Sequence, residues 1–352
     1  MFLSFIAKQR TQRPNNRKPT RAARALTALI GGLILLVVTF ILSLLYGAVH
    51  VHFSTVWQSF TNDQTLTANQ QIIRNIRIPR AIGAALVGAL LAASGAVMQG
   101  MTRNPLASPS LMGVSSGASL VMVCALVFAP QASVLSLMLC SFVGAGIGAL
   151  LVFGIALFSR GGVSPVKLVL AGMAVTAFLN ACTSTIAIRF NVARDLSFWY
   201  AGGVSGVQWL HVQLLIPVAA IGIILVLTIS RSINALSLGE ETAKGLGERT
   251  LLVKTIAILA VLLMTGAAVS AAGAVGFIGL IVPHITRFLI GGDYRWLLPC
   301  SAVFGAVLLV GADLGARMIN PPFETPVGVV TALIGVPFFL YLSRHAAGGM
   351  HG

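Results

Sequence analysis

The chain has 352 residues, of which 57% are apolar and only 9% are charged. Soluble domains carry about a quarter charged residues, so this composition excludes a water-soluble globular protein and predicts an integral membrane protein. The net charge of +15 comes without aromatic residues interleaved among the basic ones, which favours topology-setting loops beside a membrane over a nucleic-acid-binding surface.

The N-terminal segment combines a basic arm with a long apolar run. Residues 1–24 contain seven Lys and Arg, and residues 25–48 carry no charge. The apolar region of a signal peptide is about 7–15 residues long, whereas about 20 residues cross a bilayer. We therefore expect residues 25–48 to be a transmembrane helix. The preceding arm is expected in the cytoplasm beside anionic headgroups, with no specific partner.

Apolar stretches of similar length recur to the end of the chain, separated by short polar loops. Basic residues gather in the loops that are cytoplasmic if the N-terminus is inside. The sequence therefore predicts an all-α integral membrane protein of about ten helices with both termini inside. Residues 25–343 form one transmembrane domain, 344–352 form a cytoplasmic tail, and 194–206 contain a short helix. The expected spans are 25–48, 80–101, 111–130, 133–158, 166–188, 209–230, 251–271, 274–290, 297–319 and 327–343.

Four pairs of glycines are spaced four residues apart. Small residues at this spacing let membrane helices approach closely. We therefore expect helix contacts at Gly113 and Gly117, Gly144 and Gly148, Gly202 and Gly206, and Gly311 and Gly315.

Charged residues near the outer side of the membrane form two groups. Arg77-Ile-Pro-Arg80 lies just outside the second span. Its arginines are candidates either for lipid headgroup contact or for a landing patch that meets acidic groups of an external partner. Asp313 is the one carboxylate clearly within a predicted span. Arg317 follows four residues later on the same helix face, so we expect a locally neutralised pair.

The cytoplasmic loop 236–249 differs in character from the other loops. It holds three of the eight carboxylates and is punctuated by Gly239, Gly245 and Gly247. The segment from Glu240 predicts a short helix with a glycine stop at Gly245. From the residues alone, a plain solvated loop and a docking element for a partner both remain open.

Several chemical signatures are missing from the sequence. There is no GxxxxGK[ST] phosphate loop, no HExxH and no Ser/His/Asp grouping. The four cysteines stand in apolar runs, where they serve as packing residues. We therefore expect no catalytic residue, metal site or cofactor. Ion-coupled carriers need ionisable groups at membrane depth, and such groups are scarce in the expected spans, so a secondary carrier is a distant alternative. A membrane-embedded enzyme is a weaker alternative, because the catalytic groupings named above are missing.

Eight strings between residues 74 and 341 together resemble the FecCD-type permeases, which include importers of ferric siderophores, haem and cobalamin. The strings are Arg77-Ile-Pro-Arg80, Ser94-Gly-Ala-Val-Met-Gln-Gly100, Thr102-Arg-Asn-Pro-Leu-Ala-Ser-Pro109, Leu111-Met-Gly-Val-Ser-Ser-Gly-Ala118, Leu238-Gly-Glu-Glu-Thr-Ala243 with Leu246-Gly247, Gly276-Phe-Ile-Gly-Leu-Ile-Val-Pro-His284, Ala312-Asp313, and Pro326-Val-Gly-Val-Val-Thr-Ala-Leu-Ile-Gly-Val-Pro337.

The resemblance implies the ten-helix, cobalamin-importer-permease-like fold of type II ABC importers in a bacterial plasma membrane. It implies a pair of permease subunits, two cytoplasmic ABC ATPases that bind ATP and Mg²⁺, and an extracytoplasmic binding protein. The chain itself is then a transport subunit and not an enzyme. The implied cargo is an iron(III)-siderophore, with haem or cobalamin as alternatives.

The resemblance also assigns roles by position. Arg77, Arg80 and Arg317 resemble arginines that meet the binding protein, and the fifth and tenth spans resemble helices at the dimer interface and path. Asn104, Leu106 and the region of Ser164 resemble an inner gate. The ATPase-coupling residues, within loop 233–249, are Gly239, Glu240, Glu241, Ala243, Gly245, Leu246 and Gly247.

Overall fold

In the computed structural model, the described residues are 21–47, 51–61, 67–158, 165–321 and 323–348, and within these ranges the chain is helical without a strand. The helices are α2 (Arg21–Leu45), α3 (Phe53–Thr61), α4 (Ala68–Ile72), the π-helical turn η1 (Ile73–Arg77), α5 (Ile78–Thr102), η2 (Pro109–Met112), α6 (Val114–Phe128), α7 (Val134–Phe158), α8 (Pro165–Arg189), α9 (Ala193–Tyr200), α10 (Trp209–Thr228), α11 (Ser230–Leu238), α12 (Glu240–Gly245), α13 (Thr250–Ala272), α14 (Ile278–Ile290), α15 (Tyr294–Ile319) and α16 (Val327–Gly348).

These helices confirm the predicted membrane architecture. Among the described residues, seven helices are long and apolar enough to cross a membrane, and three shorter apolar helices fill the remaining predicted positions. Most boundaries agree within a few residues. The first helix begins at Arg21, inside the expected basic arm, and the rest of that arm lies outside the described residues. The short helix α9 ends at Tyr200 rather than at residue 206.

Two further boundaries differ: α16 continues to Gly348, into the expected tail, and α14 begins at Ile278 instead of residue 274. Gly273 has φ of +66° and Phe277 has φ of +68°. Both values lie in the left-handed region, where an L residue such as Phe is disfavoured, so the chain leaves the α-helical path between α13 and α14. Gly273 therefore ends α13, and α14 begins only after Phe277, whereas Gly279 lies within α14.

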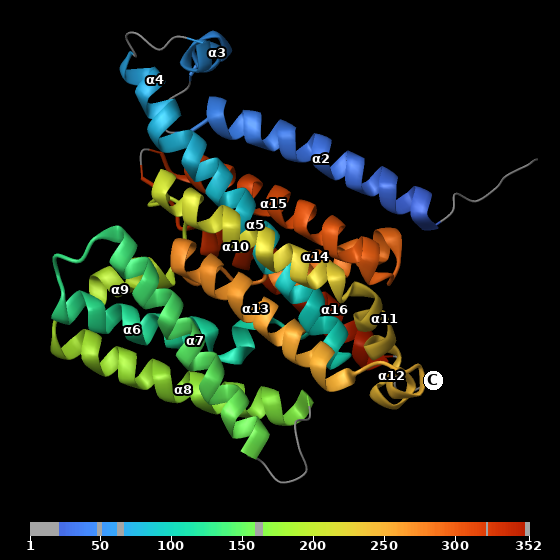
Figure 1. The fold of residues 1–352 in the computed structure, drawn as a ribbon. Coiled ribbons are helices and arrows are strands. Elements are labelled where there is room, and N and C mark those ends of the chain that lie inside the picture. The colour runs from blue at the N-terminus through green and yellow to red at the C-terminus, as the bar shows by residue number, and fades with distance from the viewer. Residues whose placement is uncertain (1–20, 48–50, 62–66, 159–164, 322, 349–352) are drawn as a thin grey trace, which may run out of the picture.

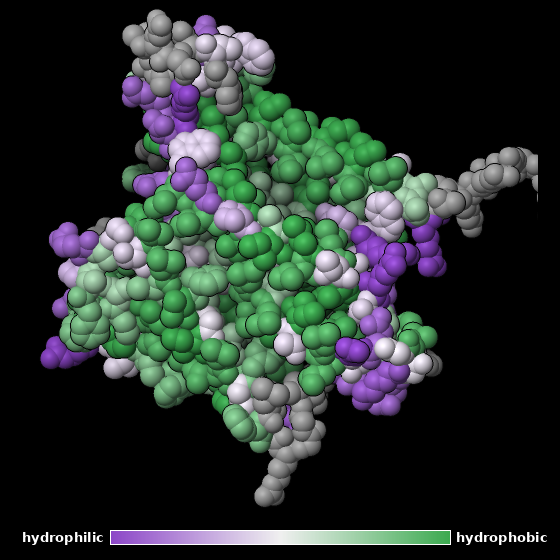
Figure 2. Space-filling view, viewed as in Figure 1, coloured by the Kyte–Doolittle hydropathy of each residue, from purple (hydrophilic) through white to green (hydrophobic). Residues whose placement is uncertain are grey.

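The surface divides into apolar sides and polar ends. Figure 2 shows hydrophobic residues over the sides of the helix bundle and hydrophilic residues gathered at its ends. Leu33, Ile34 and Val37 of α2 and Phe178 of α8 are among the exposed apolar residues. With no water to contact them in a bilayer, such side chains carry no hydrophobic penalty, so this surface is the one expected of a membrane-embedded chain.

Figure 1 places α3 and α4 at one end of the bundle, and α11, α12 and the start of α2 at the opposite end. We refer to them as the outer and inner ends, following the orientation that the loop charges predict. Helix α5 runs between the two ends and packs against α15, α13, α14 and α10. It is almost entirely buried, including Ala84, Val87, Leu90 and Val97.

Close glycine contacts join several helix pairs, two of which are described here. A Cβ added at Gly305 of α15 would clash with the carbonyl oxygen of Gly88 in α5. Likewise, Gly117 of α6 and Gly144 of α7 approach each other's backbone. Small residues at such crossings allow close packing of the backbones, which is a main source of helix association in lipid.

The glycine-spacing prediction is therefore confirmed for the two pairs that join α6 to α7, because Gly148 also meets the backbone of Gly113. It is wrong for Gly311 and Gly315 and for Gly206 of the remaining pair, where an added Cβ would have no neighbour within 4 Å among the described residues of this chain. Four-residue spacing places two glycines on one helix face but does not say which helix, if any, lies against that face.

Candidate docking and coupling sites

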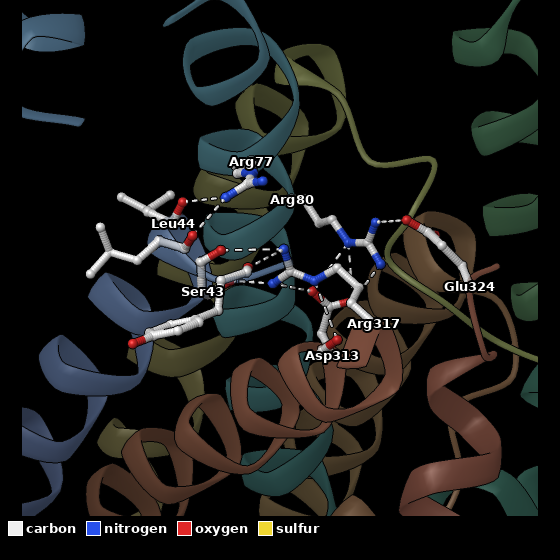
Figure 3. A network of polar contacts seen from close by, with 9 residues as sticks. Ser43, Leu44, Arg77, Arg80, Asp313, Arg317 and Glu324 are labelled. Atoms are coloured by element: carbon white, nitrogen blue, oxygen red, sulfur yellow. Dashed lines mark hydrogen bonds and ion pairs between the residues drawn. The ribbon is translucent and has the colours of Figure 1, made fainter. Parts of the chain in front are cut away.

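Five charged side chains meet at the outer end, and we refer to them as the outer cluster (Figure 3). They come from three segments that are distant in sequence: η1 and α5, α15, and the connection from α15 to α16. The members of the outer cluster are Arg77, Arg80, Asp313, Arg317 and Glu324.

The helix around Arg77 and Arg80 is locally unwound. The π-helical turn Ile73–Arg77 immediately precedes α5, whose second residue is Pro79. Proline lacks an N–H and its ring disturbs the preceding turn, which accounts for a break in the α-helical hydrogen-bond pattern at this point. The sequence Arg-Ile-Pro-Arg therefore positions both guanidinium groups toward α2 and α15.

Asp313 lies at the centre of the outer cluster and is compensated by two arginines. Arg80 donates from Nε and Nη2 to the Asp313 carboxylate at 2.8–3.1 Å. Arg317 Nη2 lies 3.2 Å from Asp313 Oδ2. The Asp313 side chain is 1% exposed. A buried carboxylate needs such partners, because an uncompensated charge away from water is strongly unfavourable.

The other arginine contacts go to the C-terminal end of α2. Arg77 Nη1 donates to the carbonyl oxygens of Leu44 and Leu45 at 2.6 and 3.2 Å. Arg317 donates to Ser43, both to its hydroxyl at 2.6 Å and to its carbonyl oxygen at 3.2 Å. The last carbonyls of a helix lack partners within the helix and carry partial negative charge, so two guanidinium groups stabilise the end of α2.

The outer cluster bears on two predictions, the Asp313–Arg317 pair and docking through the three arginines. Asp313 and Arg317 do form the locally neutralised pair expected from their spacing. The three arginines proposed for docking are only 5–7% exposed and bind within this chain. Glu324, whose side chain is 47% exposed, accepts from Arg80 Nη1 at 2.6 Å and is the most accessible member of the outer cluster. Docking through these arginines stays a prediction.

A cavity of about 690 Å³ opens beside the outer cluster. Arg80 and Glu324 line one part of it, and Trp199, Ser205 and His211 are among the residues that line the rest. The Arg80–Glu324 pair therefore lies at the border between the buried network and an open space.

At the inner end, residues 230–249 form a helix–turn–helix segment that we refer to as the inner element. Gly239 separates α11 from α12 with φ of +131°, and Gly247 has φ of +83°. The N–H of Gly247 donates to the Lys244 carbonyl and the N–H of Glu248 to that of Ala243. This is the Schellman pattern, with glycine in the left-handed position after the helix.

The predicted short helix and glycine stop are therefore confirmed, with one change. Helix α12 ends at Gly245 as expected, but the left-handed residue that closes the helix is Gly247. Ala243 is fully buried and anchors α12, whereas Leu238 and Leu246 are 70% and 66% exposed. The inner element therefore presents apolar side chains outward from a buried base.

Charges on the inner element are paired with one lysine of its own and one of α13. Glu240 accepts from Lys254 of α13 at 2.6 Å, and Lys244 lies 3.6 Å from the other Glu240 oxygen. The hydrogen bond from Lys254 is the largest cause that lowers the pKa of Glu240. The Glu241 side chain is 93% exposed. Glu240 thus fixes α12 to α13, while Glu241 is presented to the surroundings with the two leucines.

A polar contact at the base of the inner element was missed by sequence reasoning. Asn234 of α11 donates to Asp293 Oδ1 at 2.9 Å and accepts from the backbone N–H of Tyr294 at 2.8 Å. Asp293 is the N-cap of α15 and accepts from Arg295. The Arg295 guanidinium lowers the pKa of Asp293 to about 2. An Asp before an apolar helix signals an N-cap, but no local pattern indicates its partner Asn234.

The predicted inner gate is described only in part. Asn104 Oδ1 accepts from the backbone N–H of Leu106 at 2.9 Å, and the Asn104 carbonyl accepts from Ala107. This is an Asx turn, in which the Asn104 side chain holds the loop between α5 and η2. Ser164 lies outside the described residues. A gating role for Asn104, Leu106 and Ser164 stays a prediction.

Comparison with known proteins is decisive for the family. The profile of the FecCD transport family matches residues 25–345. The chain belongs to the FecCD transport family. It is 56% identical over 331 residues to the iron(3+)-hydroxamate import system permease protein FhuB of Bacillus subtilis strain 168, covering 94% of this chain and 86% of that protein.

Further comparisons agree with this FecCD assignment. The chain is 45% identical over 312 residues to the iron-uptake system permease protein FeuB of the same organism, covering 89% of this chain and 93% of that protein. A solved structure of a metal-chelate type ABC transporter in an inward-facing conformation matches with a TM-score of 0.79 and 30% identity, over 90% of this chain and 98% of that one. The chain is thus an ABC importer permease with membrane-spanning helices.

Proposed function

We propose that this FecCD permease moves an iron(III)-hydroxamate siderophore across the bacterial plasma membrane. The observation that carries the proposal is the 56% identity over 331 residues to an iron(3+)-hydroxamate import permease. Composition agrees with it, because only 9% of the residues are charged. A large chelate crosses more readily along a weakly polar path, where no tight charged site would retain it.

The energy for transport is proposed to enter through the inner element. No phosphate-binding loop occurs in the sequence, so hydrolysis of ATP is assigned to two partner ATPases. Leu238, Glu241 and Leu246 offer an exposed apolar and acidic surface on a short, well-anchored helix pair. A rigid element of this kind transmits closure of a partner as a rigid-body movement.

The outer cluster is proposed to receive the extracytoplasmic binding protein. Its arginines remain charged and hydrogen-bond carboxylates bidentately, which suits acidic groups on a partner. Arg80 already binds Glu324, so a partner carboxylate would compete with Glu324 for Nη1 of Arg80. Arg80 and Glu324 both line the cavity beside the outer cluster, which we propose as the entrance for the chelate. The exchange would then take place beside that entrance.

The proposal also includes a second permease subunit, in either one or two kinds of chain. The fifth and tenth expected spans, now α8 and α16, expose large apolar side chains such as Leu170, Phe178 and Leu333. Lipid would cover these residues in a single subunit, and a second subunit would cover part of them in a pair. The family assignment supports the pair.

Uptake into proteoliposomes tests the proposed function. The full chain is purified with the ATPase and binding protein that co-purify from its own cells, and is reconstituted with a radioactive iron(III)-hydroxamate. We expect uptake of the iron(III)-hydroxamate to require both ATP and the binding protein. Haem and cobalamin are tested as competitors for this uptake. Uptake driven by a proton or sodium gradient without ATPase would overturn the importer assignment. Preferential uptake of haem or cobalamin would overturn the cargo.

A further inference from the structure

The base of the inner element is joined to α15 through one side-chain amide. Asn234 uses both functions of its amide: Nδ2 donates to Asp293 Oδ1 at 2.9 Å, and Oδ1 accepts from the Tyr294 N–H at 2.8 Å. Both partners belong to the first turn of α15. We refer to Asn234, Asp293 and Tyr294 as the inner clamp.

The inner clamp lies where four helices meet. Tyr294 is 4% exposed, and a Cβ added at Gly100 of α5 would lie 2.7 Å from the Tyr294 ring and 2.7 Å from Ile233 of α11. Arg287 of α14 donates to the Tyr294 hydroxyl at 3.3 Å. The contacts from Gly100 and Ile233 are apolar and therefore non-directional, whereas the two Asn234 hydrogen bonds fix the register of α11 against α15.

Helix α15 connects the inner clamp to the outer cluster. It extends from Tyr294 to Ile319, and Asp313 near its other end binds Arg80 of α5. Between these points, Gly305 packs against Gly88. The two helices are therefore joined at the inner end, at the glycine contact and at the outer cluster. A displacement of α11 that is transmitted to the start of α15 reaches the residues around Asp313.

We propose that Asn234 is a positioning residue for coupling, which holds the inner element to α15 so that the two move as one body. The proposal rests on the proposed function, in which an ATPase binds α12. Helix α12 follows α11 after the single residue Gly239, so a force on α12 acts directly on α11. Without the two directional bonds, α11 could move against Tyr294 while α15 and the outer cluster stay in place.

The chain allows a swap experiment that separates this role from simple stability. Asn234→Asp removes the donor to Asp293 and places two carboxylates together, whereas Asp293→Asn leaves an acceptor for Asn234 and an N-cap for α15. In the double variant N234D/D293N, Asn at 293 donates to Asp at 234, which still accepts from the Tyr294 N–H, but the Nδ2 used for this bond does not accept from the Arg295 N–H as Asp293 Oδ1 does. The net charge of the pair is then the same as in the natural chain.

The full complex is reconstituted for each variant, and ATP hydrolysed per iron(III)-hydroxamate imported is measured together with binding-protein affinity and basal hydrolysis. For N234D we expect about a tenfold rise in ATP used per chelate, the upper range for mutations that modulate coupling between sites. Binding-protein affinity and basal hydrolysis should stay near those of the natural complex. D293N should change little, and N234D/D293N, which restores the donor–acceptor pair, should recover part of the coupling.

The outcomes distinguish this inference from the proposed function. A natural complex without ATP-dependent uptake overturns the proposed function. If the natural complex is coupled and N234D is coupled equally well, or if the double variant assembles but does not recover, the positioning role of Asn234 is overturned. Asn234→Leu removes both hydrogen bonds without adding charge. It provides the same test if N234D fails to assemble, with coupling equal to the natural complex again contradicting the role.

Discussion

The two ends of the bundle differ in how exposed the residues are that are predicted to contact a partner. At the outer end, the arginines predicted to contact a binding protein are 5–7% exposed and already bound to Asp313, Glu324 and the end of α2. At the inner end, Leu238, Leu246 and Glu241 project from a short helix pair and are mostly exposed. In the proposed function, a partner at the inner end would add contacts, whereas one at the outer end would exchange them.

This difference follows from the cost of burying charge. An exposed leucine or glutamate on a polar surface costs little before a partner arrives. Several guanidinium groups close together repel one another and require compensation where water is scarce. The outer cluster therefore contains its own carboxylates. The contacts that stabilise its arginines also make those arginines less available to a partner. The inner element has no such conflict, because its ion pairs with Lys244 and Lys254 lie at the surface.

The largest effect should come from removing the central carboxylate of the outer cluster. Asp313→Asn keeps the shape of the side chain but leaves Arg80 and Arg317 without their shared anion. Breaking a buried charge pair on one side typically lowers the free energy of unfolding by about 3–5 kcal/mol. Reversible unfolding in mixed micelles measures the change. Glu324→Gln is the matched control, because its half-exposed pair should contribute no more than about 1 kcal/mol. Equal effects of the two variants would contradict the central role of Asp313.

A smaller loss of stability is expected from a substitution at the glycine contact between α5 and α15, the two helices that run between the ends. In Gly305→Ala the new methyl group would meet the carbonyl of Gly88 and the Cβ of Ala92, so the helices must separate. Overpacking of this kind destabilises by about 1–3 kcal/mol.

The control for this substitution is Gly311→Ala, further along α15, where an added Cβ meets nothing within 4 Å among the described residues. Alanine has the higher helix propensity, so this variant should be neutral or slightly stabilising. The same unfolding measurement compares the two variants. If Gly305→Ala were as stable as Gly311→Ala, the glycine contact would not be what holds α5 to α15.

The sequence predicted what depends on local pattern. Apolar runs located the membrane helices, i,i+4 spacing located the Asp313–Arg317 pair, and glycine punctuation located α12. It did not predict the burial of Arg80, whose partners Asp313 and Glu324 lie 233 and 244 residues away. It also missed Asn234, which meets Asp293 across 59 residues. Such contacts depend on how helices are placed in space, which periodicity within one helix does not specify.

The smallest effect concerns the exchange at the outer cluster and tests the proposed docking directly. Glu324→Gln removes the negative charge that competes for Arg80 but leaves the Arg80–Asp313 bonds in place. An exposed ion pair contributes about 0.2–1 kcal/mol, so the dissociation constant of the binding protein should fall by about 1.4- to fivefold. Surface plasmon resonance with the permease in nanodiscs measures it at two salt concentrations.

Glu241→Gln is the control for this substitution, since it makes the same charge change at an exposed residue of the inner end, opposite to the proposed docking site. It should leave the dissociation constant unchanged. Weaker binding in Glu324→Gln would mean that Glu324 itself contacts the binding protein, and unchanged binding would mean that Arg80 keeps its intramolecular partners throughout docking. In both cases the proposed exchange of Glu324 for a partner carboxylate at Arg80 would be wrong. A partner at the outer end would then only add contacts, as is proposed for the inner end.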